Sequence, residues 1–307
     1  MYFTSCNISR PERASRDIYT HTRAVVSLEV RTFMSDQGQT PSGWEVDDDA
    51  AELYEEYFVP IIFAPWGERL VDRAGLQEGD RVLDVATGTG IVARRAAAEV
   101  GTSGAVVGVD IDSGMLAVAK EQASDIQPTI EWREGDAADL PFPAERFDAV
   151  FCQQGLQLFD DSLTALKEMR RVLSPDGVAV LAVWRSVEYC PGYVVLADAL
   201  DRHLEEGTGE MMRSPFDAWD TPELSALVRD AGFDDVTTTI EIGSERFPSV
   251  EEFVRREIVV TPLADRFASA DRATRSALVQ TVEDGLRDYV DDEGLVFPHE
   301  LSVVTAR

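Results

Sequence analysis

The sequence predicts an α/β fold: a doubly wound, mostly parallel sheet of seven strands, with helices on both faces and further helical segments inserted as a lid. Two observations predict it. Short apolar segments alternate with amphipathic helical segments from residue 80 onward, and a glycine-rich loop follows the first apolar segment. Short, uniformly apolar strands in repeated βα units are typical of a parallel sheet that is covered on both faces.

The expected elements follow from these periodicities and from the residues at their boundaries. Strands are expected at 81–86, 105–110, 129–136, 147–154, 178–184, 235–242 and 300–306. Helices are expected at 91–100, 113–124, 162–173, 221–233, 249–259 and 273–290. The turn "SPDG" at 174–177 is expected to end the helix before it, and βα units of this kind wind right-handedly.

Residues 47–75 predict a broken helical segment ahead of the first strand. Apolar residues recur there at helical spacing, Pro60 and Pro65 interrupt the pattern, and Gly75 ends it. The aromatic residues of this segment are Tyr54, Tyr57, Phe58, Phe63 and Trp66. Most such side chains belong to a core, and several of them ahead of a ligand loop can also supply a lid.

We expect a single domain over residues 41–307, because no linker rich in Gly, Pro or Ser divides that range. Its core is expected at about 76–185, with lid elements at about 45–70, 185–220 and 244–298. Residues 1–40 are expected to be a disordered or extraneous segment, since arginines outnumber acids in 1–33, unlike the remainder. The stretch "MSDQGQT" from Met34 resembles a natural start.

The charge of the chain excludes one class of partner and suggests an environment. Its 57 acidic and 28 basic residues give a formal charge of -29, which repels nucleic acid backbones and anionic membrane surfaces. Lys120 and Lys167 are the only lysines, and an acidic surface poor in lysine suits concentrated salt, where repulsion is screened. We therefore expect a halophilic protein; the alternative is an acidic surface for a basic partner, although the acids are spread along the chain.

Cysteine usage and hydropathy point to the cytoplasm. Three scattered cysteines are too few for a disulfide framework or a closed zinc site, so we expect a reducing compartment and no metal. No apolar run approaches the length that spans a bilayer, and no signal-peptide core lies near the start.

The stretch "VLDVATGTG" at 82–90 decides between two kinds of ligand. Its glycines, with Asp110 twenty residues beyond Gly90, fit a nucleotide loop followed by a carboxylate for the ribose hydroxyls. Asp84 in the strand would repel a pyrophosphate and would attract a cation. S-adenosyl-L-methionine combines an adenosine with ammonium and sulfonium charges and carries no phosphate, so it fits both features.

Five motifs in order resemble the class I S-adenosylmethionine-dependent methyltransferases, and among them the group of ubiquinone/menaquinone C-methyltransferases that act on small molecules. After "VLDVATGTG" these are "VVGVDIDSGMLAVA", "EGDAADLPFP", "FDAVFCQQGLQLFDD" and "EMRRVLSPDGVAVLAVW". The resemblance covers roughly residues 50 to 185 and extends loosely to the C-terminus. It implies a Rossmann-like methyltransferase fold with S-adenosyl-L-methionine as cofactor.

At the methionine end of that cofactor, the resemblance implies that Asp84 holds the amino group, and that Cys152 and Gln153 lie near the methionine moiety. The loop residues expected to bring the backbone close are Thr87, Gly88, Thr89 and Gly90. Asp84 could equally be a buried acid that backbone donors satisfy.

At the adenosine end, the resemblance implies that Asp110 accepts the ribose hydroxyls and that Ile111 and Met115 pack on the adenine. Asp136 would accept the adenine amino group, and the Ala137 backbone N–H would face a ring nitrogen. Asp110 and Asp136 could equally cap the helices that follow them.

The implied reaction is an in-line methyl transfer to a small apolar or aromatic acceptor, in which orientation in a dry pocket does most of the work. A general base is needed only if the acceptor loses a proton, and the candidates are Tyr57, Gln154, Gln157, Asp160 and His203. His203 lies on a polar helix face and is expected to be solvated. An NAD-dependent oxidoreductase, a non-catalytic S-adenosylmethionine-binding regulator and a homodimer all stay open.

Overall fold

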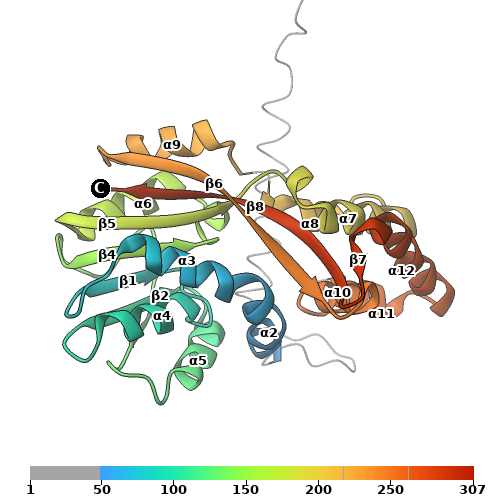
Figure 1. The fold of residues 1–307 in the computed structure, drawn as a ribbon, viewed down its shortest axis with the longest axis horizontal. Coiled ribbons are helices and arrows are strands. Elements are labelled where there is room, and N and C mark those ends of the chain that lie inside the picture. Colours follow the sequence, from blue (N-terminus) through green and yellow to red (C-terminus); the bar gives the residue numbers. More distant parts are fainter. Residues whose placement is uncertain (1–48, 217, 262) are drawn as a thin grey trace, which may run out of the picture.

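The computed structural model describes residues 49–216, 218–261 and 263–307; the N-terminal segment that we expected to be disordered or extraneous lies outside them. One sheet, drawn in Figure 1, has the strand order β3-β2-β1-β4-β5-β8-β6. Its strands are β1 (Arg81–Val85), β2 (Ala105–Asp110), β3 (Glu131–Glu134), β4 (Phe147–Gln153), β5 (Leu173–Trp184), β6 (Val236–Phe247) and β8 (Gly294–Ala306). The first five strands are parallel, and β8 runs antiparallel to β5 and β6. The predicted doubly wound sheet is confirmed, with β7 (Val290–Asp291) added beside β8.

Helices cover both faces of the sheet, because successive side chains of each strand point to opposite faces. Val82 of β1 belongs to the core cluster that α3 (Ala64–Ala74) and α4 (Ile91–Val100) complete. Leu83, the next residue, belongs to the cluster that α6 (Ser162–Val172) and α9 (Thr221–Asp230) complete. The helix α5 (Ser113–Gln122) contacts β2 and β3.

The turn predicted at 174–177 is wrong. Strand β5 begins at Leu173, directly after α6, and the residues "SPDG" belong to it. Leu173 pairs with Phe147 and Val178 with Ala149, so the pairing register shifts between these points. The extra residues form a bulge, with Pro175 and Asp176 exposed to solvent.

The segment ahead of β1 is one continuous helical rod of three parts. These are α2 (Asp49–Leu53), the π-helix η1 (Tyr54–Phe63) and α3. Pro60 does not break the rod as predicted; it lies inside the wider π winding, which tolerates the missing N–H. Gly75 ends α3 in the left-handed conformation (φ 66°), as the sequence predicts.

Strands β6 and β8 run on past the other strands as a two-stranded ribbon that carries a helical lobe (Figure 1). The lobe contains α7 (Pro191–His203), α8 (Glu210–Arg213), α10 (Val250–Val259), α11 (Leu263–Ser269) and α12 (Arg272–Leu286), with the short turns η3 (Val187–Tyr189), η4 (Ser214–Phe216) and η5 (Arg287–Tyr289). Trp184, the last residue of β5, pairs with Leu301 of β8, so the ribbon leaves the sheet at the carboxyl edge of the parallel strands. The two lid segments predicted at 185–220 and 244–298 therefore lie together beyond that edge.

Packing of the lobe on the ribbon is tested by Gly192→Ala. A Cβ on Gly192 of α7 would lie 2.3 Å from the ring of Phe297, which is fully buried. Because overpacking a core costs about 1–3 kcal/mol, we expect this loss in the free energy of unfolding from urea titration. The control is Gly114→Ala on the exposed face of α5, where the Cβ would approach only the Asp112 side chain, at 3.1 Å. Equal stability of the two variants would contradict this account of the packing.

Candidate functional site

The loop between β1 and α4 forms the expected ligand cradle at the carboxyl edge of the sheet. Ala86, Gly88 and Gly90 all have positive φ (54°, 54° and 87°), and the Thr87 N–H donates to the Val109 carbonyl of β2 at 3.0 Å. A Cβ on Gly90 would lie 2.4 Å from the Trp132 ring, so both the conformation and the space require glycine there.

Asp84 lies beneath this loop and is 1% exposed. Its Oδ2 accepts hydrogen bonds from the Thr87 hydroxyl at 2.5 Å and from the Ala93 N–H at 3.1 Å. Burial raises the pKa of Asp84 to about 7, and the two hydrogen bonds oppose that rise. A neighbouring cation would stabilise the ionised form of this buried carboxyl group and would lower its pKa.

Asp110 ends β2 and holds the loop from the other side. Its Oδ2 accepts from the Gly88 N–H at 2.7 Å and its Oδ1 from the Asp112 N–H at 3.0 Å, while burial raises its pKa. Ile111, the next residue, is 68% exposed although it is large and apolar, and Met115 is buried beside it in α5. Asp136 is exposed and forms a local turn by accepting from the Ala138 N–H at 2.9 Å, so its second oxygen stays accessible.

Two aromatic side chains of η1 close the cradle. Tyr54 and Phe63 stack at 4.9 Å between ring centroids, and both line a cavity of about 30 Å³ together with Asp84, the loop and Gln153. The η1 segment is tied down by the Arg94–Glu55 ion pair at 2.7 Å and by the bond from Gln153 Nε2 to the Phe63 carbonyl at 2.9 Å. The lid that the sequence suggested for this segment therefore consists of Tyr54 and Phe63.

Unpartnered polar atoms occur in two residues that line this cavity and in two that follow β4. In the described residues, seven buried side-chain nitrogen or oxygen atoms have no hydrogen-bond partner. Four of them are Thr89 Oγ1, Gln153 Oε1, Gln154 Nε2 and Gln157 Oε1. Buried polar atoms are normally paired, so this group indicates a ligand or water that supplies the missing partners.

The predicted residues at the end of β4 separate between two environments. The Cys152 thiol is fully buried in the core cluster under α6, and burial raises its pKa to about 12. Gln153, on the opposite face of the strand, lines the cavity. Gln153 therefore faces the cavity, whereas the Cys152 side chain points away from it.

The predicted catalytic candidates lie in different parts of the structure. Gln154 and Gln157 follow the end of β4 without lining the cavity, and Gln154 adopts a positive φ of 51°. Tyr57 is directed away, to the guanidinium groups of Arg255 and Arg256 at 5.0 and 4.9 Å from its ring centroid. His203 is half-buried in the lobe, where its Nε2 lies 2.7 Å from the Thr281 hydroxyl.

The sequence analysis missed a cluster of buried polar side chains between α3, the ribbon and the lobe. Its members are Trp66, Tyr193, Glu245, Glu257 and His299. The available signal was a glutamate and a histidine at inward positions of two strand segments, "GSERF" and "VFPHE".

The described ranges contain neither a candidate metal site nor a membrane-spanning helix. Within 49–216, 218–261 and 263–307 no group of three or more His, Cys, Asp or Glu side chains is placed to hold a metal ion. Over the same ranges, no helix combines the length and the apolar content that crossing a bilayer requires.

Comparison with known proteins gives one family. The family model described as a methyltransferase domain matches residues 82–177. The 2-phytyl-1,4-naphtoquinone methyltransferase of Trichormus variabilis is 40% identical over 118 residues, which are 38% of this chain and 52% of that protein. The ubiquinone/menaquinone biosynthesis C-methyltransferase UbiE of Ectopseudomonas mendocina is 31% identical over 188 residues, which are 56% of this chain and 72% of that protein.

The fold has solved counterparts as well. Phosphoethanolamine N-methyltransferase 2 of Haemonchus contortus, solved in complex with S-adenosyl-L-methionine, is similar with a TM-score of 0.55 and 21% identity. The similarity covers 85% of this chain and 57% of that one. The chain spans only about half the length of the first naphthoquinone methyltransferases that it matches, at 52% and 60%.

The environment of Asp84 predicts how stability depends on pH. With a folded pKa of about 7 against the ordinary 3.8, the folded protein keeps a proton that the unfolded chain releases. The group therefore favours folding at low pH, and this contribution is lost as pH rises through 7. Relative to Asp84→Asn, the wild type should lose about 2.6 kcal/mol of unfolding free energy between pH 5 and 8, most of it below pH 7 at about 1.4 kcal/mol per pH unit.

The measurement is urea unfolding across this pH range at constant salt. Asp148→Asn is the control, because Arg81 lowers the pKa of Asp148 and places its titration below this range. A difference between wild type and Asp84→Asn that stays constant with pH would contradict the assigned environment.

Proposed function

The chain belongs to the class I S-adenosylmethionine-dependent methyltransferases, the family that includes the ubiquinone/menaquinone biosynthesis C-methyltransferases, and from that premise we propose that it methylates a small aromatic molecule. The observation that carries the proposal is the group of unpartnered polar atoms around a glycine loop that holds a buried carboxyl. When bound there, S-adenosyl-L-methionine would supply an electrophilic methyl group on a cationic sulfur.

The residues around the loop fit this cofactor. Asp84 offers a carboxylate to the ammonium end, and the Thr89 hydroxyl and Gln153 carbonyl oxygen are unpartnered in the same place. Asp110 stands at the ribose position, and each of its oxygens keeps acceptor capacity beyond the bond it makes to the loop. Ile111 presents an exposed apolar side chain to the adenine face, and Asp136 and Ala137 follow at the edge.

The lid must move for this cofactor to enter. Ligand pockets have volumes of about 300 Å³ or more, whereas the cavity beneath Tyr54 and Phe63 holds about 30 Å³. Once η1 closes again over the ligand, its aromatic side chains exclude water from the reacting groups. In such a dry site, orientation of the acceptor by the amides of Gln154 and Gln157 supplies most of the rate enhancement.

An aromatic acceptor is favoured by the relatives and by the lobe. The curated relatives are named for naphthoquinone and ubiquinone/menaquinone methylation. In this chain, the interior between sheet and lobe is lined by aromatic rings, among them Trp184, Tyr193 and Phe216. We therefore assign a quinol-like or phenolic ring as the acceptor class, handled by a single cytoplasmic domain.

The dinucleotide and regulator alternatives have less support. The matched relatives are named as methyltransferases, and the buried Asp84 would repel a pyrophosphate at the loop. A non-catalytic S-adenosylmethionine-binding regulator would bind the cofactor product as well, so methyl transfer to an added acceptor distinguishes it from the enzyme.

Calorimetric titration of S-adenosylhomocysteine, with NADH as the comparison ligand, tests the proposed function. We expect micromolar binding of the former alone. Asp84→Asn should weaken it by about 1.5 kcal/mol or more, the lower value for a hydrogen bond to a charged group. Asp148→Asn serves as the control because Asp148 pairs with Arg81 at the opposite edge of the sheet. Binding of neither ligand, or equal affinity in Asp84→Asn, would contradict the proposal.

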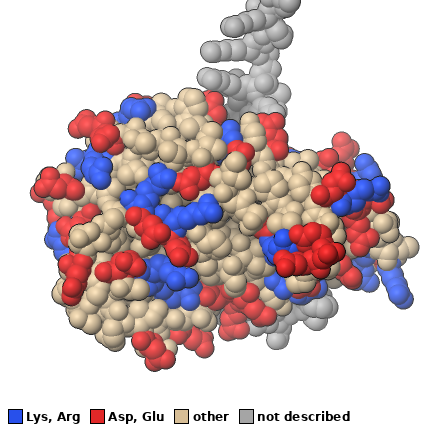
Figure 2. Space-filling model, viewed as in Figure 1, with Lys and Arg blue, Asp and Glu red and all other residues tan. Residues whose placement is uncertain are grey.

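We also propose that the surface is adapted to concentrated salt. Figure 2 shows acidic side chains spread over this face of the molecule, with basic ones between them, and the whole chain has a charge of -29. Raising potassium chloride from about 0.1 M to above 1 M shortens the Debye length from about 10 Å to below 3 Å, which screens this repulsion. We expect the unfolding midpoint to rise by several degrees, at about 2–4 °C per kcal/mol. A midpoint that does not change with salt would rule the adaptation out.

A further inference from the structure

A chain of buried polar side chains runs from α3 through the ribbon into the lobe. His299 of β8 lies at its centre, with Nδ1 2.8 Å from Glu245 Oε1 and Nε2 accepting from the Trp66 indole at 2.5 Å. The Tyr193 hydroxyl of α7 donates to Glu257 of α10 at 3.0 Å and lies 3.4 Å from Glu245. All five side chains are at least nine-tenths buried.

These contacts fix the protonation of the histidine ring. An indole nitrogen can only donate, so His299 Nε2 must be the acceptor and carries a lone pair. The ring proton is then on Nδ1 and is donated to Glu245. This is the form in which a histidine acts as a base, with a carboxylate behind it that stabilises the imidazolium when it forms.

Among the described residues, few positive charges lie near the two carboxyl groups of this cluster. In the part of the chain that the structure describes, neither Glu245 nor Glu257 forms an ion pair with Lys or Arg. Burial, together with the nearby Glu245, raises the pKa of Glu257 well above its ordinary value. Glu245 is the carboxyl group that faces His299, and a carboxylate buried in this way is costly unless a cation forms beside it.

The histidine is connected to the ligand cradle through Trp66 and the helix that carries it. It is two residues from Leu301, which pairs with the last residue of β5 at the carboxyl edge of the sheet. Its cover, Trp66, is followed by Gly67, and a Cβ on Gly67 would lie 3.3 Å from Gln153 Oε1, one of the unpartnered atoms of the cavity. Trp66 is also three residues beyond Phe63 on the same helical rod that closes the cavity.

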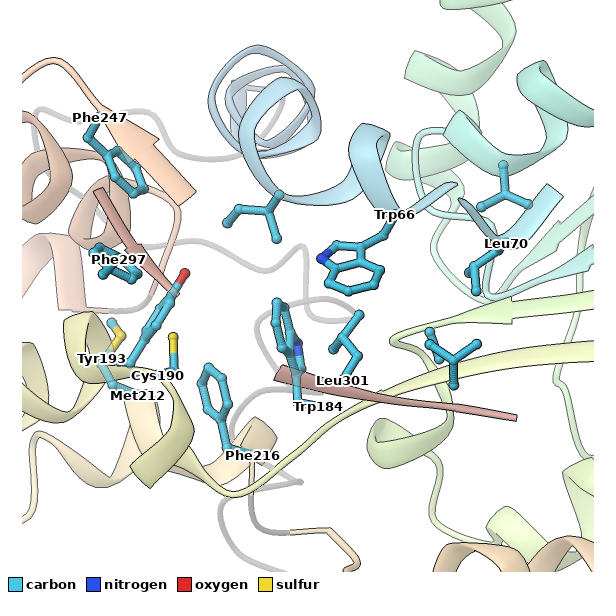
Figure 3. Close-up of a cluster of buried hydrophobic side chains, with 14 of the residues drawn as sticks. Trp66, Leu70, Trp184, Cys190, Tyr193, Met212, Phe216, Phe247, Phe297 and Leu301 are labelled. Atoms are coloured by element: carbon cyan, nitrogen blue, oxygen red, sulfur yellow. The ribbon is translucent and has the colours of Figure 1, made fainter. Parts of the chain in front are cut away.

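The basic nitrogen is closely packed among aromatic rings, so an acceptor reaches it only after Trp66 has moved. Gly243 pairs with His299 across the ribbon, and a Cβ there would lie 2.5 Å from Nε2 and 2.7 Å from the Trp66 ring. The Trp184 ring meets His299 edge-on at 5.1 Å between centroids. Figure 3 shows Trp66 and Trp184 next to each other, with the Tyr193 hydroxyl directed into the same interior.

We propose that His299 is the general base that deprotonates the methyl acceptor, that Glu245 is its positioning residue, and that Trp66 is a cover which the acceptor ring replaces when η1 and α3 move. The acceptor is then an aromatic ring that bears a hydroxyl. This inference rests on the proposed function and adds the residue that the sequence analysis did not find.

The proposed step balances in atoms and charge. The acceptor atom gives an electron pair to the methyl carbon, and the methyl–sulfur bond breaks with its electrons going to sulfur, which becomes neutral. The proton of the acceptor passes to His299 Nε2, and the positive charge moves with it to the imidazolium beside Glu245. Release of that proton to solvent restores the base.

Activity and affinity together test the base. The probe is 1,4-dihydroxynaphthalene, with methyl transfer and S-adenosylhomocysteine affinity measured on the full chain. We expect His299→Gln to lower the transfer rate by about 100-fold or more, the ordinary contribution of a general base, and to leave the affinity within about twofold.

His203→Gln is the matched control, because His203 bonds Thr281 on the far side of α7. Added imidazole should restore part of the rate of His299→Ala, which a purely structural role for the ring would not allow. Transfer by His299→Gln within about threefold of wild type would overturn the proposal.

A second readout needs no turnover and does not depend on the His299 variants. In the wild type saturated with S-adenosylhomocysteine, adding 1,4-dihydroxynaphthalene should shift the indole N–H resonance of Trp66, assigned through Trp66→Phe, because its bond to His299 breaks. An unshifted resonance would overturn the proposal even if His299→Gln failed to fold. Failure of the wild type to bind S-adenosylhomocysteine would instead refute the proposed function itself, and it is measured first.

Discussion

The buried carboxyl of Asp84 is the constraint on which the site depends. Moving a carboxylate out of water is expensive, and here only two hydrogen bonds, from Thr87 and Ala93, offset that cost. Both donors belong to segments proposed to contact the ligand: one lies in the glycine loop and the other in the first turn of α4. The group that shapes the loop is therefore also the group that gives it a preference for cations.

The rod of η1 and α3 connects the cofactor cavity to the polar cluster. Tyr54 and Phe63 close the first, and Trp66 covers the second, within a span of thirteen residues. Because the rod is continuous, a movement that opens the cavity also disturbs the hydrogen bond between Trp66 and His299. The buried apolar side chains of the rod, among them Ile62 and Leu70, belong to the core, and the Arg94–Glu55 pair and the Gln153 bond to the Phe63 carbonyl add polar contacts. The polar bonds exchange with water at low net cost, whereas the apolar contacts oppose movement of the helix.

The sequence predicts the parallel part of the fold well, because local patterns determine it. Strand β2 and helix α4 have the bounds that apolar periodicity predicts, and the loop between β1 and α4 follows from its glycines. The ribbon is longer than predicted: the polar residues of "GSERF" and Pro298 both argue against a strand in isolation. They are extended because each of the two strands pairs with the other.

The side chains of the site also fall into those that local sequence patterns predict and those that they do not. Asp84, Asp110 and Gln153 stand at strand ends that a motif can mark, and the structure brings them to the loop. Tyr54 replaces Tyr57 at the cavity because the π winding of η1 changes which residues share a face, and a period of 3.6 residues cannot show that.

The polar cluster lies beyond the reach of any local pattern. Trp66 and His299 are 233 residues apart, and Glu245 and His299 are 54 apart. Only the register of an antiparallel ribbon places Gly243 opposite His299, where the Cβ of any other residue would collide with the ring. The parallel strands and their loops thus present the residues assigned to the cofactor, and the ribbon presents those assigned to the acceptor. A change of acceptor could therefore evolve on the ribbon and lobe without disturbing the loop that Asp84 holds.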